Sequence, residues 1–218
     1  INLSVLFFTI GITIYGIEIY LNFFSKKIYS SEIIAEQLGI PYDKRTRLEV
    51  LTDLSDSGIE VYPNPSSMQN QTDNGKIIFN FGGISNITTI LPNESGFYPV
   101  IETDEHGFNN PKGLYLKDEV DIMLIGDSYS EGYSVHPNKT IASVLRQLGF
   151  NTISIGRAGN GPLREFASLK EYAKPLKPKI VLWQYCLNDL AELEREIELS
   201  ILKKYLYEDN YSQKLISR

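Results

Sequence analysis

The stretch Asp121–Gly132, DIMLIGDSYSEG, determines the fold, because an apolar run of strand length stops abruptly at Gly126-Asp127-Ser128. Such a run, without alternating polar residues, is typical of a strand buried on both faces. Strands that alternate with amphipathic helices predict a parallel sheet covered by helices. Two more predicted strands follow, at 151–156 and 178–186, and the predicted helices span 140–149, 162–174 and 189–208.

Three polar or glycine-rich segments follow the predicted strands. The first contains Ser128, the second is GRAGNGP (156–162), and the third is CLNDL (186–190). In open parallel sheets, the functional crevice lies beyond the carboxyl ends of the strands. A serine can attack a carbonyl there, while glycine N–H groups and an asparagine amide stabilise the oxyanion. The pattern therefore predicts acyl-transfer chemistry at this edge.

Taken together, GDSYSEG, GRAGNGP and LND resemble the first three sequence blocks of the SGNH (GDSL-type) hydrolases. The resemblance covers residues 118–218, and TDEHGFNNP (103–111) is similar to a segment that precedes the first block in membrane-anchored members. The resemblance implies a flavodoxin-like three-layer α/β/α sandwich, incomplete in this chain. It also implies esterase, lipase, deacetylase or O-acyltransferase activity, without a metal or an organic cofactor.

The resemblance assigns roles to three residues. Ser128 matches the nucleophile, and its own N–H matches the first oxyanion donor. Gly159 matches the second-block glycine, with Gly156 as the fallback. Asn188 matches the third-block asparagine, although a helix N-cap is the alternative for this residue. Cys186 stands where the family has glycine, which changes how closely the backbone and the substrate approach.

The family's base is a histidine in a late Asp-x-x-His block, and these 218 residues contain no such block. We therefore expect the chain to be a C-terminally truncated fragment, inactive on its own. Its two histidines are alternatives: His106 follows Asp104 in an Asp-x-His triplet, and His136 follows the serine by eight residues. Both are interpreted as loop residues.

The segment 3–24 contains one charged residue, Glu18, and predicts a transmembrane anchor. A helix of this length would span roughly 33 Å, enough for the hydrocarbon core of a bilayer. A buried core helix is the alternative. We expect a single-pass membrane protein with the catalytic domain on the periplasmic or extracellular side, although Lys26 and Lys27 argue mildly for the opposite orientation.

Residues 25–117 predict a linker and an irregular β-rich segment, with a short helix at 30–39 and a loop at 62–75. The net charge of −6 argues against a nucleic-acid surface, which needs a basic patch. Glu192, Glu194, Glu196 and Glu198 alternate along one predicted helix, so they are interpreted as mostly solvated rather than as a metal site. Trp183 is interpreted as a core residue.

The sequence therefore leads to three hypotheses. The first is a membrane-anchored serine hydrolase that cleaves an acyl ester of a glycan or a lipid. The second is an O-acyltransferase that modifies a surface polysaccharide. The third is a catalytically inactive binding protein that keeps the SGNH fold. The oligomeric state is not predicted.

Overall fold

The computed structural model describes residues 3–23, 30–64, 69–73, 76–117 and 119–217. Lys26, Lys27 and the predicted boundary residues Phe24 and Asp118 lie outside the described residues. The chain divides into two compact units, Ile1–Tyr42 and Asp43–Arg218. The prediction of a mixed α/β chain that contains a parallel sheet is confirmed.

The first unit contains α1 (Leu3–Phe23) and α2 (Ser30–Leu38), as the sequence predicts. Over Leu3–Leu21 the mean hydropathy is 1.7 and none of the window is buried, which is not the environment of a core helix. By length and composition α1 is able to cross a membrane, and a signal sequence meets the same criteria. The short α2 ends before Gly39, which has a φ of +65°.

The parallel sheet has the strand order β7-β6-β8, formed by Thr152–Ser154, Ile122–Ile125 and Ile180–Trp183. Both neighbours pair with β6 in parallel, so all three strands end at one edge of the sheet. The central strand is buried at all four of its positions, in agreement with its uninterrupted apolar sequence. The four residues of β8, in contrast, are 40–51% exposed, so the expectation that Trp183 lies in the core is wrong.

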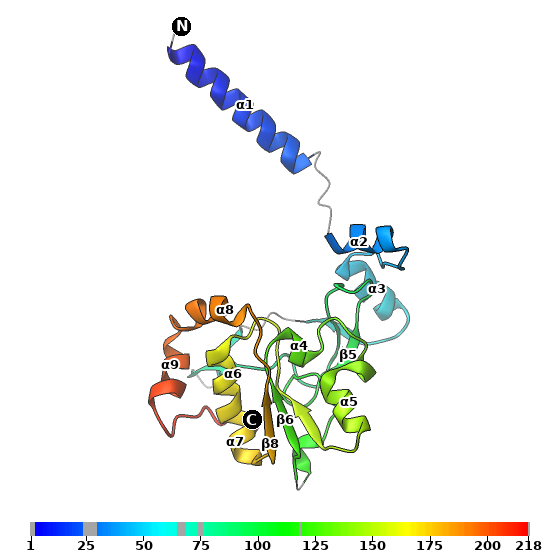
Figure 1. Cartoon of the computed structure of the whole chain (residues 1–218), viewed down its shortest axis with the longest axis vertical. Coiled ribbons are helices and arrows are strands. Elements are labelled where there is room, and N and C mark those ends of the chain that lie inside the picture. Colours follow the sequence, from blue (N-terminus) through cyan, green and yellow to red (C-terminus); the bar gives the residue numbers. More distant parts are fainter. Residues whose placement is uncertain (1–2, 24–29, 65–68, 74–75, 118, 218) are drawn as a thin grey trace. The chain divides into compact units, whose positions relative to one another are not determined.

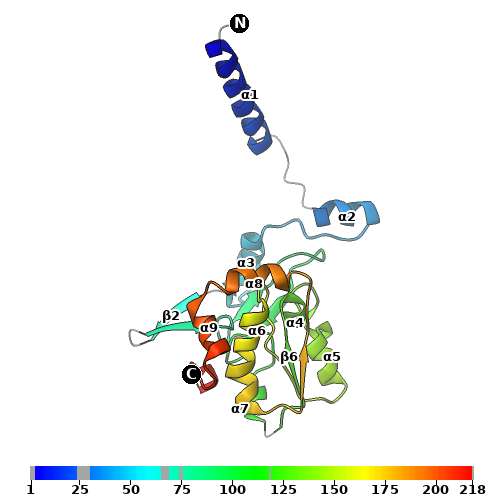
Figure 2. The same ribbon diagram turned by 60° about the vertical axis from the view of Figure 1, so that its left-hand side comes forward.

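Helices connect these strands, as their amphipathic sequences predict. α5 (Ile141–Gln147) begins at Thr140, whose side chain accepts a hydrogen bond from the Ser143 N–H. α6 (Pro162–Ser168) continues through one π-helical turn at Leu169–Ala173 into α7 (Lys174–Leu176). In both views α5 and α6 lie on opposite sides of β6 (Figures 1 and 2). A helix therefore flanks each side of the central strand.

The helix predicted at 189–208 is broken into α8 (Asp189–Glu196) and α9 (Ser200–Tyr207). The chain becomes extended at Leu199, with φ −83° and ψ 109°. The break has a physical reason, because both halves pack against α6 in different ways. Glu196 binds the first turn of α6, whereas Leu202 and Tyr205 are completely buried in the core. A straight helix does not meet both requirements.

The segment before the sheet forms short strands, as predicted. β4 (Thr88–Ile90) pairs in parallel with β1 (Val61–Pro63) and antiparallel with β5 (Val100–Glu102). The prediction of a loop at 62–75 is wrong, because β2 (Gln69–Asp73) pairs antiparallel with β3 (Lys76–Asn80). β2 is polar, so its strand structure depends on pairing with the apolar β3. The Asn74-Gly75 dipeptide, a typical hairpin signal, lies outside the described residues.

A single apolar cluster joins this segment to the sheet. Phe81 and Phe108 pack with Met123 and Ile153 in it, and all four side chains are almost completely buried. At the other end of the chain, the Gln213 side chain accepts a hydrogen bond from the Phe79 N–H (2.9 Å) and donates one to the Phe79 carbonyl (3.0 Å). Gln213 thus bonds both backbone groups of Phe79 in β3, as a residue of a paired strand would.

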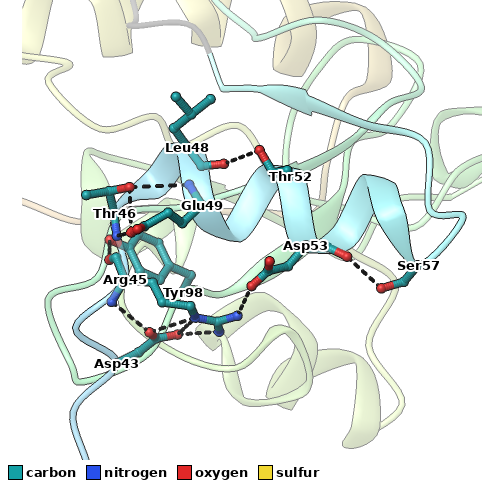
Figure 3. Close-up of polar contacts among 9 residues, drawn as sticks. All are labelled: Asp43, Arg45, Thr46, Leu48, Glu49, Thr52, Asp53, Ser57 and Tyr98. Atoms are coloured by element: carbon teal, nitrogen blue, oxygen red, sulfur yellow. Dashed lines mark hydrogen bonds and ion pairs between the residues drawn. The ribbon is translucent and has the colours of Figure 1, made fainter.

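The helix α3 (Arg47–Asp56) has a complete capping box at its first turn (Figure 3). The Thr46 side chain accepts from the Glu49 N–H, and the Glu49 carboxylate accepts from the Thr46 N–H (2.6 Å). The Arg45 guanidinium forms ion pairs with Asp43 and Asp53. The backbone carbonyl of Arg45 accepts a hydrogen bond from the Tyr98 hydroxyl (2.7 Å). The helix start is thereby fixed to the loop that contains Tyr98.

Replacing Thr46 with alanine should lower the free energy of unfolding by about 1 kcal/mol, because the Glu49 N–H loses its acceptor. Thr52→Ala is the matched control, since the Thr52 hydroxyl only bonds the Leu48 carbonyl within the helix and alanine favours a helix interior. Urea unfolding measures both variants. Equal losses would contradict the capping argument.

Candidate functional site

Ser128 lies where the sequence predicts, at the end of β6 and the start of α4 (Ser128–Glu131). Asp127 caps this short helix, because its Oδ1 accepts the Tyr129 N–H (3.1 Å). Ser128 lines a cavity of about 380 Å³ together with Glu94, Tyr129, Tyr133 and Lys139. Among the described residues, the Ser128 hydroxyl and N–H have no hydrogen-bond partner. Both groups are therefore available to a ligand.

The glycine-rich loop after β7 is tied to α4 by one buried carboxylate. Glu131 accepts from the Ala158 N–H (2.7 Å) and forms an ion pair with Arg157 (3.1 Å). Both side chains of the ion pair are at most 3% exposed. Gly159, which follows Ala158, is exposed and has a φ of +79°, a conformation that favours glycine. In the described part of the chain its N–H has no partner.

Gly156 has a different role from Gly159. A Cβ on Gly156 would lie against the Ser130 side chain and 2.8 Å from the Glu131 nitrogen. The residue therefore allows the end of β7 to approach the backbone of α4 closely. Its φ is outside the positive range, so the requirement is one of space rather than of backbone conformation. Gly156 is a packing residue, which leaves Gly159 as the glycine with an available donor.

The third strand-end loop reaches the first through the Asp127 carboxylate. The Asn188 amide donates to Asp127 Oδ2 (3.3 Å), and the Cys186 thiol donates to Asp127 Oδ1 (3.3 Å). Asn188 precedes α8, yet its side chain does not cap that helix. Asp189 fixes the loop, because its carboxylate accepts from the Cys186 N–H (2.8 Å). Asp127 and Asp189 thus maintain the geometry of these loops.

Cys186 is not activated as a nucleophile. Burial raises the pKa of its thiol to about 11, and the hydrogen bond to Asp127 acts in the same direction. Only a small fraction of the thiol is ionised near neutral pH, and the thiolate is the reactive form. The residue therefore acts as a small side chain that bonds Asp127.

The sequence did not predict a second group of buried carboxylates beside these loops. Glu165 of α6 is 1% exposed and accepts the Trp183 indole N–H (2.6 Å), while its other oxygen has no partner among the described residues. Burial, and next the carboxylates of Asp189 and Asp127, raise the pKa of Glu165 to about 7. Glu165 belongs to no recognisable sequence motif, so its position beside these loops becomes apparent only in the folded structure.

The prediction that the glutamates of 192–198 are solvated is wrong for Glu196, which is 1% exposed. Its carboxylate accepts from the N–H groups of Gly161 (2.7 Å) and Leu163 (2.9 Å), at the start of α6. A helix N-terminus attracts negative charge and leaves N–H groups unpaired, so it stabilises this carboxylate. The pattern of apolar residues along α8 does not reveal that Glu196 has its hydrogen-bond partners on α6.

Neither histidine is bonded to Ser128. The His106 ring contacts the rings of Tyr115 and Tyr172, with centroids 4.5 and 5.3 Å away, and burial lowers its pKa. The His136 ring stacks on Phe97 with centroids 4.1 Å apart. Both histidines are thus packed against aromatic side chains. Among the described residues, no group of histidine, cysteine and acidic side chains has the arrangement of a metal site.

Comparisons of this chain with protein-family models, with curated proteins and with solved structures found no match.

Removing one partner of the buried Glu131–Arg157 ion pair should strongly lower the free energy of unfolding. Arg157→Met leaves a buried carboxylate without its counter-charge, so we expect a loss of about 3–5 kcal/mol in the free energy of unfolding. The double variant Glu131→Gln/Arg157→Met should lose clearly less than the sum of the two single variants. Urea unfolding of all four proteins measures this coupling.

The exposed pair Arg195–Glu192 provides the control for that cycle, since the Arg195 side chain is 75% exposed. The corresponding cycle there should give a coupling below about 1 kcal/mol. Similar coupling in the two pairs would show that burial of Glu131 and Arg157 has no energetic consequence.

The raised pKa of Glu165 predicts a pH-dependent stability. Between the ordinary value of 4.5 and about 7, the folded protein keeps a proton that the unfolded chain releases. The corresponding stability is complete below pH 4.5 and disappears as the pH rises through 7. Glu165→Gln cannot ionise, so between pH 5 and pH 8 its stability relative to wild type should rise by roughly 2–3 kcal/mol.

Urea unfolding at these two pH values tests the prediction, with Glu194→Gln as the control because Glu194 is exposed on the neighbouring α8. The control should behave like the wild type at both values. If the difference in unfolding free energy between Glu165→Gln and the wild type is the same at both pH values, a buried, protonated Glu165 is ruled out.

Proposed function

We propose that the chain is the N-terminal part of an SGNH-type serine hydrolase that cleaves an acyl ester of a glycan or a lipid. Ser128 attacks the ester carbonyl, and the oxyanion is bound by the N–H groups of Ser128 and Gly159 and by the Asn188 amide. The function needs neither a metal nor an organic cofactor. The main support is the Asn188–Asp127 hydrogen bond, which brings the third predicted block beside the serine loop.

The strand order gives independent support. In chain order, the parallel strands β6, β7 and β8 are arranged 2-1-3 across the sheet. This is the order of the first three strands of flavodoxin-like sheets, in which the ligand binds beyond the strand ends near the first strand. Ser128 follows that first strand directly. The proposal therefore extends the observed parallel sheet to a flavodoxin-like α/β/α sandwich.

The hydrogen bonds of the resting loops suit oxyanion binding. The N–H groups of Ser128 and Gly159 are unpaired in the part of the chain that the structure describes. The Asn188 amide is paired with Asp127, but at 3.3 Å this bond is longer than most strong N–H···O bonds. A side-chain amide has two N–H donors, and the described structure gives the Asn188 amide one acceptor, Asp127, so its second N–H is available for the oxyanion.

The reaction proceeds by acyl transfer through the serine. As Ser128 Oγ bonds to the carbonyl carbon, its proton passes to a base, and collapse of the tetrahedral intermediate expels the alcohol, which takes up that proton. Water then attacks the acyl-enzyme and releases the acid. Because His106 and His136 pack against aromatic rings, the proposal assigns the base to a histidine in an Asp-x-x-His block outside these residues.

The proposed location of the enzyme is based on α1. As a membrane anchor, the helix would hold the hydrolase domain at a membrane surface, where lipid and surface-polysaccharide esters occur. We place the domain on the periplasmic or extracellular side. If a sugar hydroxyl replaces water as the acceptor, the same residues would act as an O-acyltransferase.

A catalytically inactive binding protein is the second candidate. One observation favours it: neither histidine of the chain is bonded to Ser128 in the described structure. In that case the cavity beside Ser128 would bind a ligand without cleaving it. The two candidates differ in whether the serine is activated.

The full-length protein should react covalently with a fluorophosphonate at Ser128, and peptide mass spectrometry should locate the adduct there. Ser128→Ala should abolish the labelling, whereas Ser134→Ala, which removes another serine of the same cavity, should not. Asn188→Ala should lower kcat for p-nitrophenyl acetate by about 10²–10³, as expected for the loss of one oxyanion donor.

Absence of labelling in a correctly folded protein would reject the enzyme and favour the binding protein. Supplying an oligosaccharide acceptor separates the two enzymatic activities. A hydrolase releases the free acid, whereas an acyltransferase yields the acylated oligosaccharide.

A further inference from the structure

A second cavity of about 700 Å³ lies between β5, α5 and the loop at 109–111. Its volume is within the range of small-molecule sites. Its lining shares no residue with the cavity at Ser128. It therefore needs an explanation of its own, independent of the proposed hydrolase activity.

The positive charge in this cavity comes from Arg146, in the last turn of α5. Its Nη1 donates to the Thr152 carbonyl (3.0 Å) and to Asn110 Oδ1 (3.3 Å). These bonds fix the plane of the guanidinium, because Asn110 is itself held by hydrogen bonds to the N–H and carbonyl of Ser154. The remaining N–H groups of Arg146 have no partner among the described residues.

No carboxylate in the described part of the chain is paired with Arg146. In the described structure the residue forms no ion pair, and burial lowers its pKa. Glu102 also lines the cavity, but it is exposed to solvent on β5. A partly buried guanidinium with free in-plane donors is suited to a carboxylate, which it can bind through two parallel hydrogen bonds.

Hydrogen-bond acceptors lie around the same cavity. The amide nitrogens of Gln147 and Asn109 donate to the carbonyls of Asn138 (2.7 Å) and Glu131 (2.8 Å). These bonds fix the orientation of both amides and leave their side-chain oxygens without a partner among the described residues. Pro111 and Pro137 add apolar ring surfaces to the lining.

We propose that this cavity binds an acidic sugar, a monosaccharide unit that carries a carboxylate. Arg146 holds the carboxylate, the amide oxygens of Gln147 and Asn109 accept from hydroxyl groups, and the proline rings contact the C–H face of the sugar ring. A neutral sugar would leave Arg146 unpaired, and a simple carboxylic acid would leave the amide acceptors unused. Both parts of the ligand are thus required by the lining.

Ligand-observed NMR titration of the full chain in detergent micelles tests this proposal, with D-glucuronate as the probe. D-glucose should bind at least tenfold more weakly, because it lacks the carboxylate. Arg146→Gln should weaken glucuronate binding at least tenfold, and Arg146→Lys, which retains the charge but not the planar pair of donors, by a smaller factor. Gln147→Ala should weaken glucuronate binding without affecting the preference for the acid.

Arg195→Gln is the matched control, since Arg195 is an exposed arginine on α8, and it should bind glucuronate like the wild type. Thermal unfolding confirms that each variant is folded, and Arg146→Lys maintains the test if Arg146→Gln is not. Equal binding of glucose, unchanged binding by a folded Arg146 variant, or no binding of glucuronate would each overturn the proposal. Tighter binding of glucose 6-phosphate would overturn it in favour of a phosphate site. None of these results depends on Ser128 reactivity.

Discussion

Buried carboxylates hold together the loops that follow the parallel strands. Glu131 joins α4 to the Ala158 N–H and to Arg157, and Asp127 joins α4 to Cys186 and Asn188. Where the chain leaves a regular strand, its backbone N–H groups need other hydrogen-bond acceptors. A carboxylate can accept hydrogen bonds from several donors. These contacts link the three loops beyond the ends of the strands.

This arrangement has an electrostatic cost. Burial raises the pKa of Glu131, Glu165, Asp189 and Glu196, so the molecule contains several carboxyl groups whose charge is unfavourable. Arginines and helix N-terminal N–H groups offset the cost at Glu131 and Glu196. At Glu165 the Trp183 indole N–H is the one hydrogen-bond donor among the described residues, and burial favours the protonated carboxyl group there. Similar crowding of carboxylates is common where pKa values are shifted for function.

Much of the parallel sheet was predictable, because Ile122–Ile125 and Ile180–Trp183 are apolar without interruption and the three strands alternate with amphipathic helices. The polar strand β2 was not, since its pairing with β3 overrides its own low strand propensity. The burial of Glu196 and the exposure of Trp183 also escaped prediction. Both depend on which element lies alongside, and periodicity within one segment contains no information about that neighbour. The same limit applies to the site: the residue types were recognisable, but their bonds to Asp127 and Glu131 were not.

The Gln213–Phe79 contact has a consequence for biosynthesis. It joins residues 134 positions apart, so the loop that it closes spans most of the chain. The hairpin of β2 and β3 is synthesised early but cannot be fastened until Gln213 has left the ribosome. Contacts of such long range slow folding, because the entropy of loop closure is lost before the contact stabilises the fold. The apolar α1 emerges long before that point, while the rest of the protein is still unfolded.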